Sequence, residues 1–334
     1  MKSSWRQRYG EMSERKPELD FSVLTAFNAN IDLRTNFEEL NWDLENVEPE
    51  NLDAVENIDD VKSVLKHAME HGENIECELK NLEKEIIGEK NLGGQAGIMA
   101  NFLSGLKGSV TFYTPFLSDE LAELVDEKVL HPYFDEEFTL KNVRDASNTD
   151  RTKKNIIIEF NQENSGRLIL SDTLRGFGPY FRSGIEDNLN LIDENVDRVL
   201  VSGFHNAEGN FEPKIAKSVS QLEKLKSPKH LEMVDCQDDK FKHIMEELAP
   251  HVDSIGLDET EGKKVRDFFD LETEENLHIG EAFEMSKKLI DRSNLERVHL
   301  HTYRYHLLVT DESYPSSLER MRDAMIFGET SAVL

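Results

Sequence analysis

The second half of the sequence alternates short apolar segments with amphipathic segments, and this pattern restricts the fold more than any other feature. From Asp193 onward the apolar runs RVLVSG, HLEMVDC, DSIGLD and VHLHTY are separated by helix-like segments such as KIAKSVSQLEKL and DKFKHIMEEL. Short strands joined by amphipathic helices require right-handed crossovers between parallel strands. We therefore expect an α/β fold built on a doubly wound, mostly parallel sheet.

The first third of the chain adds a strand, an acidic insertion and a glycine turn. FSVLTAFNANID (21–32) predicts an apolar strand that ends in polar residues, which suits a ligand site. The acidic stretch 33–89 contains the helical pattern VKSVLKHAMEHG, with Gly72 as its expected C-cap. NLGGQAGIMANFLSGL (91–106) predicts a glycine turn that opens an apolar helix, and the strand SVTFYTPF follows it.

The segment 115–171 is β-rich. NIIIEF and GRLILS, separated by NQENS, predict a β-hairpin. We expect the two insertions to form a second, smaller domain. The expected division is a large α/β domain from 1–32, 91–114 and 173–334, and a smaller domain from 33–90 and 115–172.

Composition excludes several classes of protein. The formal net charge of −28 repels nucleic acids and anionic membranes, so a phosphorylated ligand would need a local basic pocket. No apolar run approaches the roughly 20 residues that cross a bilayer, and the N-terminus lacks a secretory pattern. Cys77 and Cys236 have no zinc-site spacing and are expected to be buried thiols. We expect a cytoplasmic monomer without a nucleic-acid or membrane partner.

Six segments in a fixed order carry a resemblance to a known family. They are AFNANID (26–32), NLGGQAGIMAN (91–101), YTPFLSDELAELV (113–125), HLEMVD (230–235), VDSIGLDETE (252–261) and VHLHTYRYHLL (298–308). Together they resemble the ADP-dependent sugar kinases, the phosphofructokinase/glucokinase family of the ribokinase-like superfamily. The resemblance extends from about Phe21 to the end, and GGQAGIMAN is its most specific part.

The resemblance implies a ribokinase-like α/β domain closed by a smaller lid domain, with the sugar held in the cleft between them. It implies transfer of the β-phosphoryl group of ADP to fructose 6-phosphate or glucose, leaving AMP, with Mg²⁺ or another divalent cation. The two insertions fall where the lid segments of the family lie. A catalytically silent sugar-binding protein is an alternative. An acidic interaction protein would fit the charge but would leave the six ordered motifs unexplained.

Two short motifs supply candidate sugar ligands. Asn30 and Asp32 share one side of an extended chain, and the carboxylate can accept hydrogen bonds from two neighbouring hydroxyl groups. Asp32 could instead cap a helix. Gly93 and Gly94 let backbone N–H groups approach a ligand, and Gln95 could add an amide contact. The same string is also an ordinary strand-to-helix turn.

Sugar choice depends, by resemblance, on three side chains. Lys153 and Arg167 flank the predicted hairpin and align with cations that hold the sugar 6-phosphate in the phosphofructokinase branch. A third arginine of the family is replaced by Thr173, with Arg175 two residues later. Glu76 aligns with a glutamate that contacts the sugar 2-hydroxyl in the glucokinase branch. Together these residues imply an enzyme that accepts both sugars.

Acidic residues at predicted strand ends supply a candidate metal site. By resemblance, Glu232 of a His-x-Glu pair helps to hold a hydrated magnesium ion, and Asp258 and Glu261 form a second acidic motif. Mg²⁺ keeps several waters, so one or two carboxylates suffice. Each acid could instead be a surface charge of this acidic protein. We expect three histidines to be structural: His278, His299 and His301.

The resemblance also implies a GxGD motif, whose aspartate is the general base and whose glycines form an anion hole. No GxGD occurs in these 334 residues, so no residue is assigned a catalytic role. The sequence fits either part of an active kinase or a natural truncation. We expect the chain as given to bind sugar weakly and to turn over little.

Overall fold

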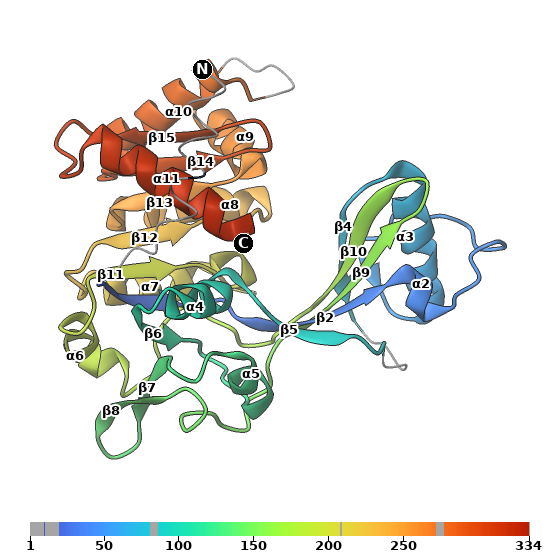
Figure 1. The fold of residues 1–334 in the computed structure, drawn as a ribbon, viewed down its shortest axis with the longest axis horizontal. Coiled ribbons are helices and arrows are strands. Elements are labelled where there is room, and N and C mark those ends of the chain that lie inside the picture. The colour runs from blue at the N-terminus through green and yellow to red at the C-terminus, as the bar shows by residue number, and fades with distance from the viewer. Residues whose placement is uncertain (1–9, 11–19, 81–85, 208, 272–276, 334) are drawn as a thin grey trace.

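The computed structural model describes residues 10, 20–80, 86–207, 209–271 and 277–333. Most of the first nineteen residues of the expected range 1–32 therefore lie outside the described residues. The described chain forms two β-sheets, a large one with helices on both faces and a small one, joined by strands that run from one to the other (Figure 1).

The large sheet has nine strands in the order β15-β14-β13-β12-β11-β1-β6-β7-β8. The strands from β14 to β7 are all parallel, whereas the edge strands β15 and β8 are antiparallel to their neighbours. The expected doubly wound, mostly parallel sheet is thus confirmed. Its strands are β1 (Ser22–Ala26), β6 (Ser109–Tyr113), β7 (Leu130–Phe134), β8 (Phe138–Asn142), β11 (Arg198–Val201), β12 (Lys229–Glu232), β13 (Ser254–Leu257), β14 (Arg297–His301) and β15 (His306–Thr310).

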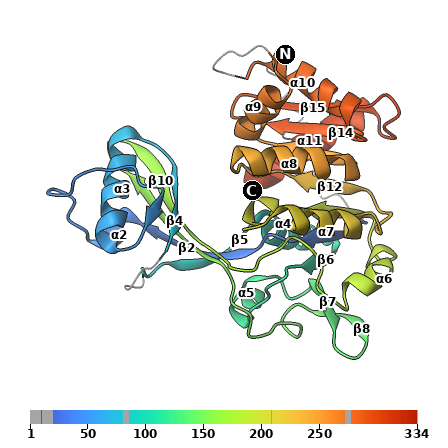
Figure 2. The same cartoon turned by 180° about the vertical axis from the view of Figure 1, so that it is seen from behind.

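Helices cover both faces of this sheet, so its strands are apolar on both sides. Val23 and Leu24 are neighbours in β1, yet they belong to different hydrophobic clusters. In Figure 1 α4 and α11 lie in front of the sheet, whereas α7 and α8 lie in front in the reverse view of Figure 2. The helices are α4 (Gln95–Gly105), α5 (Asp119–Leu124), α6 (Leu189–Asp193), α7 (Glu212–Leu222), α8 (Asp238–Glu247), α9 (Glu259–Phe268), α10 (Ile279–Arg292) and α11 (Leu318–Val333), with single 3₁₀ turns at Glu186–Asn188, Phe204–Asn206 and Ala249–His251.

The six-stranded sheet and its two helices form the smaller domain. The strand order is β3-β4-β10-β9-β2-β5. As the sequence predicted, β9 and β10 form an antiparallel hairpin, and α3 ends at Gly72, whose φ of 67° suits glycine. The elements are β2 (Asn30–Asn36), β3 (Ala54–Val55), β4 (Ile75–Leu79), β5 (Glu89–Gly93), β9 (Lys154–Asn161), β10 (Ser165–Asp172), α2 (Phe37–Leu40) and α3 (Ile58–His71).

The two faces of this small sheet differ in polarity. One face packs against α3, with residues such as Ile158 and Leu168 fully buried, and α3 lies on the side away from the large sheet (Figures 1 and 2). We call the opposite face the open face. Strand register places three rows of residues on it: Asp32, Asn155, Ser171 and Glu78; then Arg34, Ile157, Ile169 and Glu76; then Asn36, Glu159 and Arg167.

The boundary between the sheets differs from the sequence expectation in two places. The single strand expected over 21–32 is two strands, because the chain leaves the large sheet after Ala26 and enters the small sheet at Asn30. The range 115–172 does not belong wholly to the smaller domain, since β7 and β8 pair within the large sheet. The physical reason is that Val129 and Val143, which flank this hairpin, are fully buried in the same cluster as Val23 of β1.

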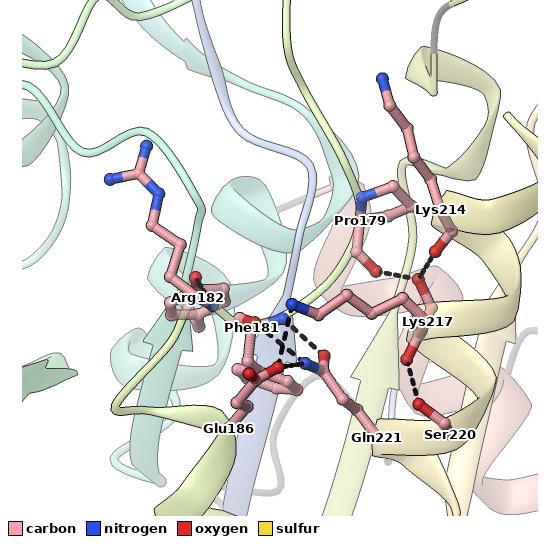
Figure 3. Close-up of polar contacts among 10 residues, drawn as sticks. Pro179, Phe181, Arg182, Glu186, Lys214, Lys217, Ser220 and Gln221 are labelled. Carbon is pink, nitrogen blue, oxygen red and sulfur yellow. Dashed lines mark hydrogen bonds and ion pairs between the residues drawn. The ribbon is translucent and has the colours of Figure 1, made fainter. Parts of the chain in front are cut away.

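The return connection from β10 to α6 is fixed to helix α7. The buried side chain of Gln221 accepts a hydrogen bond from the Phe181 N–H at 2.8 Å and donates to the Phe181 carbonyl at 3.0 Å, as Figure 3 shows. Lys217 forms an ion pair with Glu186 at 3.0 Å, and Ser218 donates to the Pro179 carbonyl at 2.5 Å. The bonds to the backbone of Phe181 and Pro179 satisfy groups that lack regular partners in this irregular segment, and the ion pair adds a further link to α7.

Candidate active site

The segments that cross between the two sheets carry a connected set of amide side chains. Asn28, between β1 and β2, donates to Gln95 Oε1 at 2.6 Å, and it accepts from Asn206 Nδ2 at 3.1 Å. Lys153, just before β9, donates from Nζ to Asn206 Oδ1 at 3.0 Å. Because these residues come from four separate parts of the chain, the contacts hold the crossing points together.

A buried carboxylate lies next to this set, on the open face. Asp32 is 7% exposed, and its Oδ1 accepts from Asn30 Nδ2 at 2.6 Å and from Asn155 Nδ2 at 3.3 Å. Ser171 in turn donates to Asn155 Oδ1 at 3.3 Å. Burial raises the pKa of Asp32, although the two amides and the charge of Arg34 oppose the rise. Among the described residues no donor reaches Asp32 Oδ2, so this oxygen is open to a ligand hydroxyl.

The glycine turn of the sequence motif lies directly against these residues. A Cβ atom on Gly93 would lie 2.5 Å from Asp32 Oδ2, and one on Gly94 would lie 2.6 Å from the Asn28 carbonyl oxygen. Gly94 has a φ of 77° and precedes the first residue of α4. Both glycines are therefore required by the close approach of the two strands and by the turn.

Six of the predicted sugar-binding residues are brought together at this junction, and two are not. Asp32 lies in the middle of β2, so the alternative role as a helix cap is wrong. Arg167 is exposed, and Glu159 is its neighbour in the strand register of the hairpin. At roughly 3.3 Å per residue, Glu159 lies about 20 Å along β9 from Lys153. The group at the junction is Asn30, Asp32, Gly93, Gly94, Gln95 and Lys153.

Glu76 is the second residue that lies away from the junction. It is exposed on the open face, one row farther out than Asp32. The acidic residue in the row of Asp32 is Glu78, which is three strands away, about 14 Å at the usual strand spacing. Glu78 Oε1 accepts from the Thr173 hydroxyl at 3.2 Å.

Glu232 ends β12 at the edge of the large sheet where the parallel strands reach their carboxyl ends. Its Oε2 lies 3.1 Å from His230 Nε2, and its Oε1 lies 4.0 Å from His301 Nε2. Gly256 on the next strand leaves room for the carboxylate, because a Cβ there would overlap it. Burial alone would raise the pKa of Glu232, but the hydrogen bond from His230 and the charge of His301 hold it below its usual value.

Asp258 and Glu261 are joined by a capping box at the start of α9. Asp258 accepts from the Glu261 N–H at 2.9 Å, and Glu261 Oε2 accepts from the Asp258 N–H at 2.5 Å. Burial, together with the contact with Asp258, raises the pKa of Glu261 to about 9. Within the part of the chain that the structure describes, no three His, Cys, Asp or Glu side chains are grouped as a metal site. A largely hydrated Mg²⁺ needs only one or two carboxylates, so the assignment of Glu232, Asp258 and Glu261 to a metal stays a prediction.

A cavity of about 610 Å³ lies between the β14–β15 turn and α11. Its wall combines the aromatic rings of Tyr303 and Tyr305, the side chains of Met325 and Arg322, and His306. His306 stacks against His301 at 6.4 Å between ring centroids, and His301 is the neighbour of Glu232. The expectation that His299 and His301 are only structural therefore stays a prediction.

Comparison with known proteins identifies the family. The conserved region of ADP-specific phosphofructokinase/glucokinase matches residues 21–333. The chain belongs to the ADP-specific phosphofructokinase/glucokinase family. The family predicted from the six ordered motifs is thus confirmed, and the family name makes ADP the phosphoryl donor. No helix in the described ranges has the length and apolar character needed to span a membrane.

Several individual members of this kinase family are similar to the chain. The ADP-specific phosphofructokinase of Pyrococcus horikoshii is 30% identical over 361 residues, which cover 93% of this chain and 80% of that protein. The ADP-dependent glucose/glucosamine kinase of Pyrococcus abyssi is 29% identical over 269 residues, or 73% and 58% of the two chains. A crystal structure of a hypothetical ADP-dependent phosphofructokinase from P. horikoshii superimposes with a TM-score of 0.78 at 26% identity, over 92% of this chain and 79% of that one.

Three residues of the candidate kinase site were missed in the sequence: Asn28, Asn155 and Asn206. Asn28 carries a usable signal, because it precedes Asn30 and Asp32 at the same period of two. Asn206 follows an apolar strand, as ligand residues of parallel sheets often do. Asn155 sits inside a strand-like apolar run, and nothing in its local sequence distinguishes it from a surface residue.

Proposed function

We propose that this chain binds a hexose or hexose phosphate at the junction of the two sheets, as an ADP-dependent sugar kinase that forms AMP. The observation that carries the proposal is Asp32, a buried carboxylate with one oxygen held by two amides and the other open. A carboxylate fixed in this way can accept hydrogen bonds from sugar hydroxyl groups. Gly93, Gly94 and Gln95 lie next to this carboxylate, on the adjacent strand and at the start of α4.

Fructose 6-phosphate is the first candidate substrate. Lys153 places an ammonium group at the junction, where it can neutralise a phosphate close to Asp32. The similar P. horikoshii protein is named an ADP-specific phosphofructokinase, and a solved ADP-dependent kinase of the same fold, with a TM-score of 0.77 at 23% identity, is in complex with fructose 6-phosphate and ADPβS. These names support the choice of substrate.

Glucose is the second candidate. It is favoured by Glu78, a carboxylate in the same row of the open face as Asp32 that can accept hydroxyl protons but would repel a phosphate. The similarity to the glucose/glucosamine kinase of P. abyssi supports the same candidate. Both sugars therefore belong in any binding experiment.

We place ADP at the carboxyl edge of the large sheet, with its base in the 610 Å³ cavity. Aromatic rings and an arginine suit a nucleobase and a phosphate chain. Glu232 would hold a hydrated Mg²⁺, with Asp258 and Glu261 as further acidic residues of the site. When bound, the ion would neutralise charge on the transferring phosphoryl group.

The test is a calorimetric titration of the chain with each sugar, together with an assay for AMP formation from ADP and Mg²⁺. Asp32→Ala should abolish sugar binding, whereas the control Asp311→Ala, at an exposed site whose carboxylate bonds to Ser313 and to the Glu312 backbone, should leave it unchanged. Sugar binding without AMP would favour the sugar-binding alternative. Wild-type binding that survives Asp32→Ala would refute the proposed site.

A further inference from the structure

Tyr303 is held in an exposed position by a braced turn. The Thr302 hydroxyl accepts from the N–H groups of Arg304 and Tyr305 at 3.1 and 3.0 Å, and the Tyr305 hydroxyl is anchored on the Leu277 carbonyl at 2.9 Å. The side chain of Tyr303 is nevertheless 98% exposed. A rigid turn that presents one large aromatic ring to solvent is typical of a contact surface rather than of a core.

The ring of Tyr303 faces the open face of the smaller domain. A space of about 660 Å³ lies between the two domains. Among the described residues, Tyr303 is the only one from the large domain that lines it. The others belong to the outermost row of the open face and its surroundings, including Arg167, Glu159 and Asn36. Arg167 is exposed, and among the described residues its guanidinium has no ion pair or hydrogen bond, whereas its backbone N–H bonds to Asn74. Arg167, whose guanidinium has no partner among the described residues, and the exposed Tyr303 therefore line the same opening.

We propose that Arg167 and Tyr303 form a latch, in which the guanidinium stacks on the ring when the smaller domain closes over the sugar. Such a contact between a cation and an aromatic ring is favourable when the two groups meet, and it strengthens as water is excluded. The latch depends on the proposed function in one respect: the bound sugar is what favours closing of the smaller domain. It gives Arg167 a role as a positioning residue in place of the phosphate contact expected from the sequence.

The distances on the open face favour this role over phosphate binding. Lys153 lies at the junction with Asp32, about 20 Å along the hairpin from the residue opposite Arg167. One hexose phosphate held by Asp32 and Lys153 cannot also reach Arg167 in this arrangement. Tyr303, by contrast, is separated from Arg167 only by the space that closing would remove. Tyr303 also lines the 610 Å³ cavity, so a ligand there would contact the same ring.

The first experiment tests the approach of the two residues without any ligand. In the variant with Arg167→Cys and Tyr303→Cys, a short bifunctional thiol reagent should give a crosslinked monomer. A direct disulfide is not expected, because it needs Cα atoms within roughly 4–7 Å of each other and a guanidinium stacked on a ring holds them farther apart. The control pairs Tyr303→Cys with Glu70→Cys, an exposed position on α3 at the other side of the sheet. The native Cys77 and Cys236 should not interfere, since burial raises the pKa of each to about 11.

A crosslink in the test pair and none in the control supports the latch even if no sugar binds, so its outcome is separate from that of the proposed function. Equal crosslinking in both pairs, or none in either, overturns it. Arg167 and Tyr303 are both exposed, so the substitutions should not prevent folding.

The second experiment is a double-mutant cycle on sugar affinity. Tyr303→Ala and Arg167→Gln should each weaken glucose and fructose 6-phosphate by the same factor, roughly twofold to thirtyfold, and the double variant should be no weaker than either single one. Tyr303→Phe keeps the ring and should keep the affinity. Additive losses would overturn the latch. Loss of fructose 6-phosphate alone in Arg167→Gln would assign Arg167 to phosphate binding instead.

Discussion

Asn155 donates a hydrogen bond from Nδ2 to Asp32 Oδ1 at 3.3 Å, and it joins two strands whose bonded residues are 123 positions apart in the sequence. The two residues are also direct neighbours in the register of β2 and β9. The bond holds a buried carboxylate in one orientation, with its second oxygen facing Gly93. The proposed sugar site therefore depends on strand pairing within the smaller domain as well as on the motif NANID.

Asn155→Ala should weaken sugar binding about tenfold, because a hydrogen bond to a charged group contributes about 1.5–3 kcal/mol. It should also raise the pKa of Asp32 further, since the Asn155 amide lowers the pKa that burial raises. Sugar binding requires the ionised carboxylate, so its loss on acidification should begin at a higher pH in the variant. Calorimetric titrations between pH 4 and 8 measure both effects. Asn161→Ala, at the exposed end of the same strand, is the matched control. An identical pH profile in Asn155→Ala and wild type would contradict the assignment.

Gly93→Ala should abolish the site while leaving most of the fold intact. The new methyl group would lie 2.5 Å from Asp32 Oδ2, closer than any real Cβ contact, so the carboxylate must move. We expect sugar affinity to fall at least tenfold and stability to fall by about 1–3 kcal/mol. Gly105→Ala, at the end of α4 with no atom within 4 Å of the added methyl group, is the control. It should be neutral or stabilising by about 0.4–1 kcal/mol. Equal effects of the two substitutions, measured by urea unfolding and titration, would rule out the steric explanation.

His131 gives the large domain a specific sensitivity to acid. Burial against Tyr113, whose ring lies 5.4 Å away, lowers the pKa of His131 to about 4 from an ordinary value of 6.5. A folded pKa below the unfolded one means that this stability is fully present above pH 6.5 and is lost as the pH falls toward 4. The loss amounts to about 3 kcal/mol over that window.

His131→Phe should therefore flatten the dependence of stability on pH between 6.5 and 4. Urea unfolding at several pH values measures the slope. His71→Phe, at an exposed position on α3, should keep the wild-type slope. If both variants lose stability on acidification as steeply as wild type does, His131 is not the group responsible.

The sequence predicted those parts of the fold that local patterns determine. Short apolar strands such as β11 and β13, separated by amphipathic helices, implied a mostly parallel sheet. The hairpin of β9 and β10 and the end of α3 at Gly72 followed from turn residues. A strand pattern does not say which sheet the strand joins, however, so β7 and β8 were assigned to the wrong domain.

The candidate site was predicted where its residues share a motif and missed where they meet only in space. Asn30 and Asp32 are two residues apart, whereas Asn28 and Asn206 are separated by 178 positions and meet because β1 and β11 pair. The family resemblance assigned both Lys153 and Arg167 to the sugar phosphate, but the length of β9 separates them in the structure. Register, which the sequence alone does not give, decides these cases.

The last prediction concerns the choice between the two sugars. Lys153→Ala removes the ammonium group at the junction, so it should weaken fructose 6-phosphate by roughly tenfold to a hundredfold and glucose little, because only the former carries a phosphate. Glu78→Ala should act in the opposite direction: it removes a carboxylate from the row of Asp32, which weakens glucose and relieves repulsion of the phosphate.

Glu76→Ala is the matched control for Glu78→Ala, since it removes the same charge from the same strand and face, one row farther from the junction. It should change neither sugar more than about twofold, because it lies one row, about 7 Å along the strand, farther from the junction than Glu78. Parallel titrations of the three variants with both sugars decide the matter. A larger effect on glucose from Glu76→Ala than from Glu78→Ala would restore the assignment of Glu76 made from the sequence. It would mean either that the register of the strands on the open face shifts by two residues or that the sugar binds farther out than Asp32.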